Sequence, residues 1–465
     1  MYKQMFEKIK ADDALKKKIE ERLDTMGAEK HKKKISGVVL VAACIAVGAS
    51  TAFAATSPAV QQAISNVISY FESEKANPLS DEAALLQYNK AVGLSCSRDG
   101  YNITVDNIAA DDNFIHIFYT VTSDEPFDNP YYGGVFGMPN LVYRIDGAMA
   151  RMGNHNESDS YYADEHTLKG VDKINISEMT LPEQFFLELY TNQIGDSEPS
   201  LKGSDSRYKE LYNYEKNVIL TDEDKEKLWS IGVQINKADV QADSVVKNVN
   251  KKVNLNNTDF TVKKVIMSPF GNQITIDGIA NFALYDDKGN SLDVLNTDLQ
   301  GGGDNAYEFL KADKNMRSLT LVPLKETPTD QPMDKVVMDL DQFPIRAEMS
   351  EYGNLVITGV SIDENVVKVD YYKDGFIPYD PGMSLLDGSG NDDFGSRCLL
   401  DIRVNHESNS YTAVYTFYDE QDGKPGIYKP AQDVIDKVSQ ISKIELYQIG
   451  GIVPDMDNGV KIDLN

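Results

Sequence analysis

The sequence YNITVDNI at residues 101–108, followed by FIHIFYTV at residues 114–121, decides the fold class of this chain. Apolar residues recur at every second position in both stretches, and a short acidic break separates them. A period of two is typical of half-buried β-strands, and a polar break between two such strands is typical of a hairpin. We therefore expect an antiparallel pair of strands here.

The same strand pair recurs twice further along the chain. The first strand of each copy has apolar residues at offsets of 0, +2 and +5, and a second alternating strand follows. The copies begin with Ile103, Val105 and Ile108; with Phe260, Val262 and Val265; and with Leu355, Ile357 and Val360. Repeats of this length, rich in strands and turns, predict a mainly β fold with three tandem immunoglobulin-like β-sandwich modules.

The length of 465 residues agrees with about three domains, at roughly 150 residues per domain. The restarts of the repeat place the three modules at residues 96–245, 246–347 and 348–465. Ahead of them we expect a cytoplasmic amphipathic segment at residues 1–34, a transmembrane helix at residues 35–56 and a juxtamembrane helical stalk at residues 57–95.

The transmembrane prediction rests on residues 35–55, which are 21 positions without a charge. As a helix they extend about 32 Å, enough to cross the hydrocarbon core of a bilayer. Residues 1–34 contain 11 Lys and Arg against 7 Asp and Glu, whereas the rest of the chain contains 35 against 66. Positive charge stays on the cytoplasmic side, so the acidic bulk is expected outside the cell. The alternatives are a signal peptide cleaved after Ala54 and a buried helix of a soluble domain.

The cytoplasmic segment carries apolar residues at helical spacing, and 34 residues are too few to bury them. One interpretation is that this face binds in a groove on a cytosolic partner. The other is that the segment lies on the inner leaflet of the membrane. The residues that we expect to bind the partner are Met5, Phe6, Ile9, Leu15, Ile19 and Leu23.

Two further helices are expected directly after the apolar stretch. Ser57 and Pro58 are typical of a helix start, and an apolar face follows up to Phe71. A second helix is expected from Ser80, ending at Gly93. This stalk either docks on the first exterior module or contacts the membrane surface.

Composition excludes several function classes. A net charge of −27 repels nucleic acid and anionic membrane surfaces over most of the chain. The 5 His residues stand in no catalytic or metal-binding pattern that we recognise, and no nucleotide-binding motif is present. We therefore expect no enzymatic activity, no cofactor and no metal site. Only Cys96 and Cys398 are left to form a disulfide, because Cys44 lies in the apolar stretch.

Three polar regions admit a binding role beside a structural one. Residues 286–290 and 387–393 resemble calcium loops but lack the full spacing, so β-turns are the preferred interpretation. His155 and His166 lie in an acidic stretch that we interpret as a solvated loop rather than a metal site. A tyrosine-rich patch is either a recognition surface or packing within the first module. Its residues are Asn129 to Gly134, with Tyr143, Tyr161 and Tyr162.

The layout of residues 1–125 resembles a known family. It combines a short charged amphipathic N-terminus, one apolar span that ends in small residues, Ser57-Pro58 opening a helix, and the strand pair of residues 101–121. This layout resembles Gram-positive single-pass membrane proteins of uncharacterised function that have a juxtamembrane immunoglobulin-like domain. Such proteins are often described as anti-sigma factors of the extracytoplasmic-function class. The resemblance implies a sigma factor as the cytosolic partner, although residues 1–26 are shorter than a full zinc-binding anti-sigma domain and lack its His/Cys pair.

Two functions from different classes follow. The first is a membrane-anchored extracytoplasmic sensor or regulator that holds a cytosolic partner through its N-terminal helix. The second is a cell-surface adhesion protein, or a wall- or glycan-binding protein, with no regulatory role. An exterior hydrolase is a distant third because no catalytic motif supports it.

Overall fold

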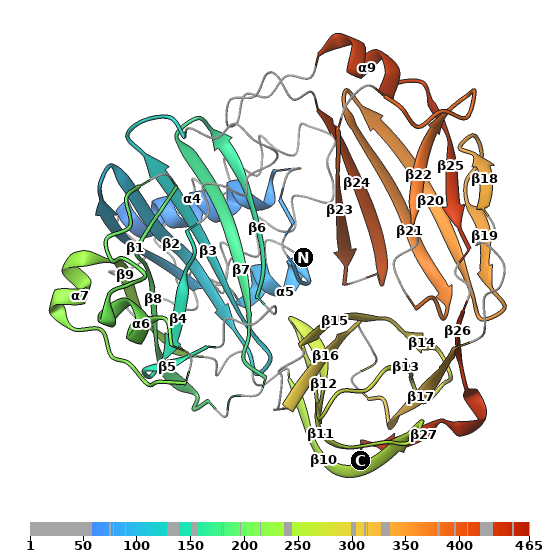
Figure 1. Ribbon diagram of the computed structural model, residues 1–465, viewed down its shortest axis with the longest axis horizontal. Helices are drawn as coiled ribbons and strands as arrows, with labels where there is room; N and C mark the ends of the chain where they lie inside the picture. Colours follow the sequence, from blue (N-terminus) through green and yellow to red (C-terminus); the bar gives the residue numbers. More distant parts are fainter. Residues whose placement is uncertain are drawn as a thin grey trace, which may run out of the picture. The chain divides into compact units, whose positions relative to one another are not determined.

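The computed structural model describes most of the chain beyond residue 57 (Figure 1). The described residues are 58–73, 76–77, 79–88, 90–127, 139–150, 156–177, 179, 181–195, 197–213, 215–236, 244–298, 304–310, 313, 315–326, 335–378, 382–394, 397–406, 408–418, 431–448 and 451–464. The expected cytoplasmic segment at residues 1–34 and the expected transmembrane helix at residues 35–56 lie outside them. Among the helices that are described, none is both long enough and apolar enough to cross a membrane.

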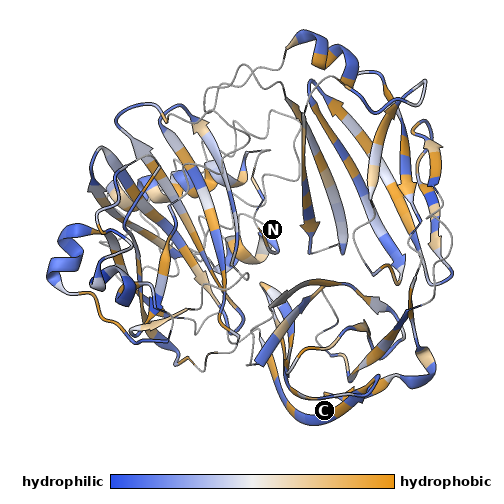
Figure 2. Ribbon diagram, in the orientation of Figure 1, coloured by the Kyte–Doolittle hydropathy of each residue, from blue (hydrophilic) through white to orange (hydrophobic). Residues whose placement is uncertain are grey.

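The described chain is mainly β, as the sequence predicts, and its strands form six sheets. It divides into two compact units. The first contains the described residues up to 244 together with residues 268–270, and the second contains nearly all of residues 245–465. Hydropathy alternates along many strands, as Figure 2 shows. In the strand Trp229–Asn236 every second side chain, from Trp229 to Ile235, is buried.

The first module consists of two antiparallel sheets. One has the strand order β1 (Lys90–Arg98), β2 (Tyr101–Ala110), β3 (Phe114–Ser123), β7 (Thr167–Asn175), β6 (Asn156–Asp164). The other has the order β5 (Ala148–Met149), β4 (Val142–Ile145), β8 (Gln184–Thr191), β9 (Trp229–Asn236). The hairpin expected at residues 101–121 is confirmed as β2 and β3, which pair antiparallel.

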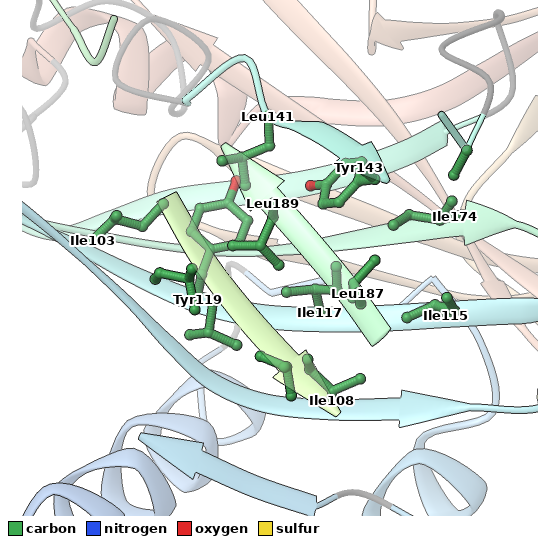
Figure 3. Packing of buried hydrophobic residues seen from close by; sticks show 14 of the residues in the cluster. Ile103, Ile108, Ile115, Ile117, Tyr119, Leu141, Tyr143, Ile174, Leu187 and Leu189 are labelled. Carbon is green, nitrogen blue, oxygen red and sulfur yellow. The ribbon is translucent and has the colours of Figure 1, made fainter. Parts of the chain in front are cut away.

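The core of the first module lies between these two sheets (Figure 3). Ile103, Ile115 and Ile117 of the first sheet pack in one apolar cluster with Leu187 and Leu189 of the second. Each of these side chains is at most 1% exposed, so the alternation seen in the sequence identifies the core face correctly.

Among the described residues, four helices accompany the first module. Helix α4 (Pro58–Phe71) begins at the expected proline, and α5 (Glu82–Tyr88) follows it. The connection between β8 and β9 contains α6 (Ser206–Leu211) and α7 (Asp222–Lys227). Thr221 caps α7 in a reciprocal capping box with Asp224, which satisfies two backbone amides at the helix start.

The expected end of the second helix at Gly93 is wrong. Helix α5 ends at Tyr88, and Gly93 lies inside strand β1, at a register shift between Ala91 and Leu94. Its φ is +62°, and a Cβ at this position would lie 3.0 Å from the carbonyl group of Ala59 in α4. The glycine is therefore required by the bulge and by the close approach of the helix, not by a helix terminus.

The second module repeats the arrangement of the first. One sheet has the order β10 (Val245–Leu255), β11 (Thr258–Ser268), β12 (Gly271–Asp277), β16 (Asp304–Phe309), β15 (Val294–Asp298). The other contains β14 (Ser291–Leu292), β13 (Phe282–Tyr285) and β17 (Ser318–Glu326), and β17 also pairs with β26 (Ile452–Pro454) and β27 (Val460–Asp463).

The third module has a five-stranded sheet of the same kind. Its order is β19 (Ile345–Ser350), β20 (Gly353–Asp363), β21 (Val366–Gly375), β24 (Ser410–Tyr418), β23 (Arg397–Asn405). The facing sheet has the order β18 (Lys335–Asp339), β25 (Ile441–Tyr447), β22 (Met383–Asp387). Helix α9 (Gln432–Val438) precedes β25.

Strand pairing divides the last two modules differently from the boundaries inferred from the sequence. Residues 335–347, assigned above to the second module, contribute β18 and part of β19 to the third. Residues 452–463, assigned to the third, return to β17 of the second. The third module is thus inserted between β17 and β26 of the second. An insertion is tolerated when the inserted domain has neighbouring ends, and β18 and β25 pair side by side.

The strand order differs from that of an immunoglobulin domain. In such a domain the second and third strands lie in different sheets. Here the first three strands of the first module, β1, β2 and β3, lie together in one sheet, as do those of the second module, β10, β11 and β12.

The +5 offset of the sequence repeat corresponds to a β-bulge in the first and third modules. Pairing of β2 with β3 shifts between Val105 and Asn107, and pairing of β20 with β21 shifts between Ile357 and Gly359. The extra residue in β2 is Asp106. It lets Ile108 return to the core face while Asp106 stays on the opposite face.

The two acidic stretches that resemble calcium loops form closely related turns. The Asp286 carboxylate accepts hydrogen bonds from the backbone N–H groups of Lys288 and Asn290, at 2.9 and 2.7 Å. The Asp387 carboxylate accepts equivalent bonds from Ser389 and Asn391, at 2.8 and 2.9 Å. These bonds to the ionised form lower the pKa of Asp387 to about 2.

Candidate functional site

The six residues expected to bind a cytosolic partner lie outside the described residues; they are Met5, Phe6, Ile9, Leu15, Ile19 and Leu23. The described part of the chain shows a different candidate site, the contact of helix α4 with the first module. Only Thr56 and Ser57 separate α4 from the apolar stretch that ends at residue 55. Figure 1 shows α4 running across β1, β2 and β3.

An apolar contact holds the C-terminal half of α4 on the sheet. Val67 and Tyr70 are 1% and 2% exposed and share a cluster with Phe118 of β3, Tyr161 of β6 and Val171 of β7. The rings of Tyr70 and Phe118 meet edge to face with 5.5 Å between their centroids. This is the favoured geometry of an aromatic pair, and it adds to the hydrophobic gain of burial.

Polar contacts fix the position of the helix on this apolar surface. Asn66 Nδ2 donates to Asp106 Oδ1 at 2.8 Å, and Tyr70 Oη donates to Asp159 Oδ2 at 2.8 Å. Lys169 Nζ donates to the carbonyl oxygen of Asn66 at 3.1 Å and also to the hydroxyl of Ser69. Such bonds are directional, so they select one register of the helix on the sheet.

Burial changes the acidity of the groups beneath the helix. Removal from water raises the pKa of Asp106 to about 7, although hydrogen bonds from Thr120 and Asn66 and the charge of Lys169 oppose the rise. Removal from water likewise raises the pKa of Tyr70 and lowers that of Lys169. The contact therefore contains a carboxyl group that titrates near neutral pH.

The first module should be less stable at neutral pH than in mild acid, in part because of Asp106. Its folded pKa is about 7 against an ordinary value of 3.8. The folded state therefore keeps a proton that the unfolded state releases, and the free energy of unfolding falls as pH rises from about 4 to about 7. The drop is on the order of 4 kcal/mol for this group.

Asp106→Asn is expected to remove this contribution and to flatten the pH profile. Unfolding of the first module can be followed by the fluorescence of Trp229, the single tryptophan of the chain, which is 1% exposed. Buried Asp172, whose pKa is also raised to about 7, will leave a residual slope. Asp124→Asn, at an exposed position, is the matched control. An unchanged slope in Asp106→Asn would contradict the assignment.

A second structured feature of the first module is built around Arg144 of β4. Its side chain is fully buried at 0% exposure. Nε donates to the hydroxyl of Tyr190 at 2.9 Å, Nη1 to the carbonyl of Lys216 at 2.8 Å and Nη2 to that of Leu211 at 2.6 Å. Nη1 also donates to the carbonyl of Gly147 at 3.0 Å. One guanidinium thus ties the connection of residues 192–228 to the four-stranded sheet.

Arg144→Lys is expected to loosen this connection. An ammonium group has three donors in place of five and cannot reach the same carbonyls, so buried acceptors lose their partners. A loss of about 3 kcal/mol or more in the free energy of unfolding is expected. Hydrogen exchange of residues 201–228 measures the local effect. Lys216→Met, which changes an exposed side chain and keeps the carbonyl, should exchange like the wild type.

The other residues singled out in the sequence have structural positions. Tyr143, Tyr161 and Tyr162 are buried, so these three members of the tyrosine-rich patch pack inside the module and offer no recognition surface. The other members, residues 129–134, lie outside the described residues, as does His155. Cys96 and Cys398 are free thiols.

Sequence reasoning did not identify Asp106, Asp159, Lys169 or Arg144 as site residues. The sequence signal for Asp106 is the spacing of the apolar residues Ile103, Val105 and Ile108. The step from Val105 to Ile108 breaks the period of two, and the polar residue at this break lies in the bulge. Arg144 stands in an otherwise apolar strand, VYRI, which is an unusual position for a cation.

Two sequence families match parts of the chain. A domain of unknown function (DUF4179) matches residues 30–123, and a family of unknown function (DUF5643) matches residues 244–347. The first match covers the expected span together with α4 and β1 to β3. The second begins with β10. Among curated proteins there is no match.

Two solved structures show a distant likeness. The crystal structure of the conserved domain protein from Bacillus anthracis is 11% identical, and the match covers 72% of this chain and 92% of that one at a TM-score of 0.33. The N-terminal eight Ig domains of Down Syndrome Cell Adhesion Molecule are 7% identical, with 76% and 39% covered at a TM-score of 0.14. Likeness at these TM-scores supports no conclusion about function.

Proposed function

We propose that this chain is a membrane-anchored extracytoplasmic sensor or regulator. In this proposal residues 1–34 hold a cytosolic partner, a sigma factor in the simplest form, residues 35–55 cross the membrane, and the β modules lie outside. Helix α4 connects the span with the first module. The match of residues 30–123 to a domain family that spans this junction agrees with the proposal.

The observation that carries the proposal is the way α4 is held. A helix that served only as a spacer would need no hydrogen bonds to the module, whereas α4 is fixed through Asp106, Asp159 and Lys169. Two residues of chain reach at most about 7 Å. A displacement of α4 on the sheet is therefore transmitted directly to the end of the span.

The test uses the full-length chain in its native membrane. Wild type is expected to retain a cytosolic protein in a pull-down, and the triple variant Leu15→Ala, Ile19→Ala, Leu23→Ala is expected to lose it. Val67→Asp, which breaks the α4 contact, should retain the partner but change the output of a reporter gene that the partner controls. Identical retention by wild type and the triple variant would refute the proposal.

A surface adhesion or glycan-binding protein is the second candidate. A cavity of the first module that is lined by polar residues, among them Asn140, Gln193 and Lys202, favours it. In that case deletion of residues 2–28, with the lysine cluster kept, changes no gene expression. The effect of this deletion on gene expression therefore distinguishes the two candidate functions.

A further inference from the structure

Residues of the connection 192–228 line a cavity of about 540 Å³ on the first module, and this cavity is open to solvent. This volume lies in the range of sites for small ligands. The Arg144 hydrogen bonds described above hold one side of the connection on β4, through Leu211 and Lys216. The Tyr190 hydroxyl donates to the same Leu211 carbonyl at 2.6 Å. The cavity is therefore formed by a fixed segment rather than by an unsupported loop.

Two tyrosines form an aromatic platform in this cavity. The rings of Tyr208 and Tyr212 stack with 4.3 Å between centroids and an angle of 17°. Tyr212 is fixed further by its hydroxyl, which donates to Asn192 Oδ1 at 2.8 Å. Gly203 lies beside Tyr208, and a Cβ there would come within 3.8 Å of Cε1, so the absence of a side chain leaves the ring accessible.

The polar lining is mixed and nearly neutral. Asn140 and Gln193 offer amide donors and acceptors, while Glu198 and Lys202 contribute one negative and one positive charge. All four residues are exposed. An anionic ligand is disfavoured by the net charge of −27, and a purely apolar ligand is disfavoured by the amides.

We propose that this cavity binds a neutral saccharide. A sugar ring presents a face of C–H groups, which packs on an aromatic ring, and an edge of hydroxyl groups, which exchange hydrogen bonds with amides and carboxylates. Tyr208 supplies the platform and Asn140, Gln193, Glu198 and Lys202 supply the polar partners. If the chain is the sensor proposed above, a neutral saccharide is the class of ligand that its exterior part binds. Saccharide binding can be measured whether or not a cytosolic partner exists.

Calorimetry on the full-length protein in detergent tests the proposal with defined probes. Chitotetraose and cellotetraose are the neutral saccharides, and tetragalacturonate is the anionic comparison. We expect saturable binding of at least one neutral saccharide with a Kd below about 1 mM, and weaker binding of the anionic one. Absence of saturable binding by both neutral probes would overturn the proposal, and the sensor function would still stand or fall by the pull-down.

Two variants locate the binding. Gly203→Leu fills the space beside Tyr208 from an exposed position and is expected to weaken binding at least about tenfold without changing the melting temperature. Tyr208→Ala removes the platform and should weaken binding by a similar factor. Tyr372→Ala, which removes an exposed tyrosine of the third module (37% exposed), is the matched control. Wild-type affinity in Gly203→Leu would place the saccharide elsewhere and refute the assignment.

Discussion

Removal of residues 449–465 is expected to unfold the second module and to leave the third module folded. The deletion takes away β26 and β27, which pair with both ends of β17. It also removes Ile462 and Leu464, which are 0% and 2% exposed in the core of the second module. Each buried aliphatic side chain contributes about 2–5 kcal/mol, against a total domain stability of about 5–15 kcal/mol.

Limited proteolysis with mass spectrometry distinguishes the two modules. Cleavage sites are expected throughout strands β10 to β17, whereas the strands of the third module, from β18 to β25, stay protected. Met456→Ala, at a position 52% exposed in the same returning segment, is the control and should be protected throughout. Equal protection of both modules after the deletion would show that the second module does not depend on the returning strands.

Tyr70→Ala is expected to release α4 from the first module. The change removes a ring that is 2% exposed and leaves Asp159 without the hydroxyl donor. The expected loss is about 3–5 kcal/mol. An isolated helix of 14 residues is marginal in water, so α4 should then unfold or exchange rapidly.

Hydrogen exchange in the full-length chain measures this release. Amides of residues 61–71 should exchange at least about 100-fold faster in Tyr70→Ala. Tyr70→Phe keeps the ring and removes only the hydroxyl, so a smaller increase is expected. Gln61→Ala changes an exposed position of the same helix and serves as the control. If Tyr70→Ala exchanges like Gln61→Ala, the tyrosine does not hold the helix.

Local patterns predicted the repeated hairpins well. A period of two depends only on which side chains face the core, and Ile103, Ile115 and Ile357 are buried as that period requires. Helix α7 is also specified locally, because the capping box of Thr221 and Asp224 depends on neighbours in sequence. The helix ends at Lys227, and Trp229 begins strand β9.

The partners of the last strands could not be predicted in the same way. Strand β18 follows β17 in the sequence but pairs with β25, and β26 follows β25 but pairs with β17. An alternating pattern shows that a segment is a strand, but it does not show which strand becomes its partner. The choice is made by long-range packing, such as Ile462 in the core of the second module. For the same reason the sequence left two alternatives open for α4, docking on the first module or contact with the membrane surface. Docking depends on distant residues such as Asp159, which is 89 residues from Tyr70 and accepts its hydrogen bond.

Insertion of the third module has a mechanical consequence. If tension acts between α4 and a point beyond β27, the load passes through the first and second modules. In the sequence, the third module lies between β17 and β26 of the second. It therefore bears no tension as long as β26 and β27 stay paired with β17. Peeling of these two strands would bring the third module under load. Under such tension, the pairing of β26 and β27 with β17 would therefore determine whether the third module bears force.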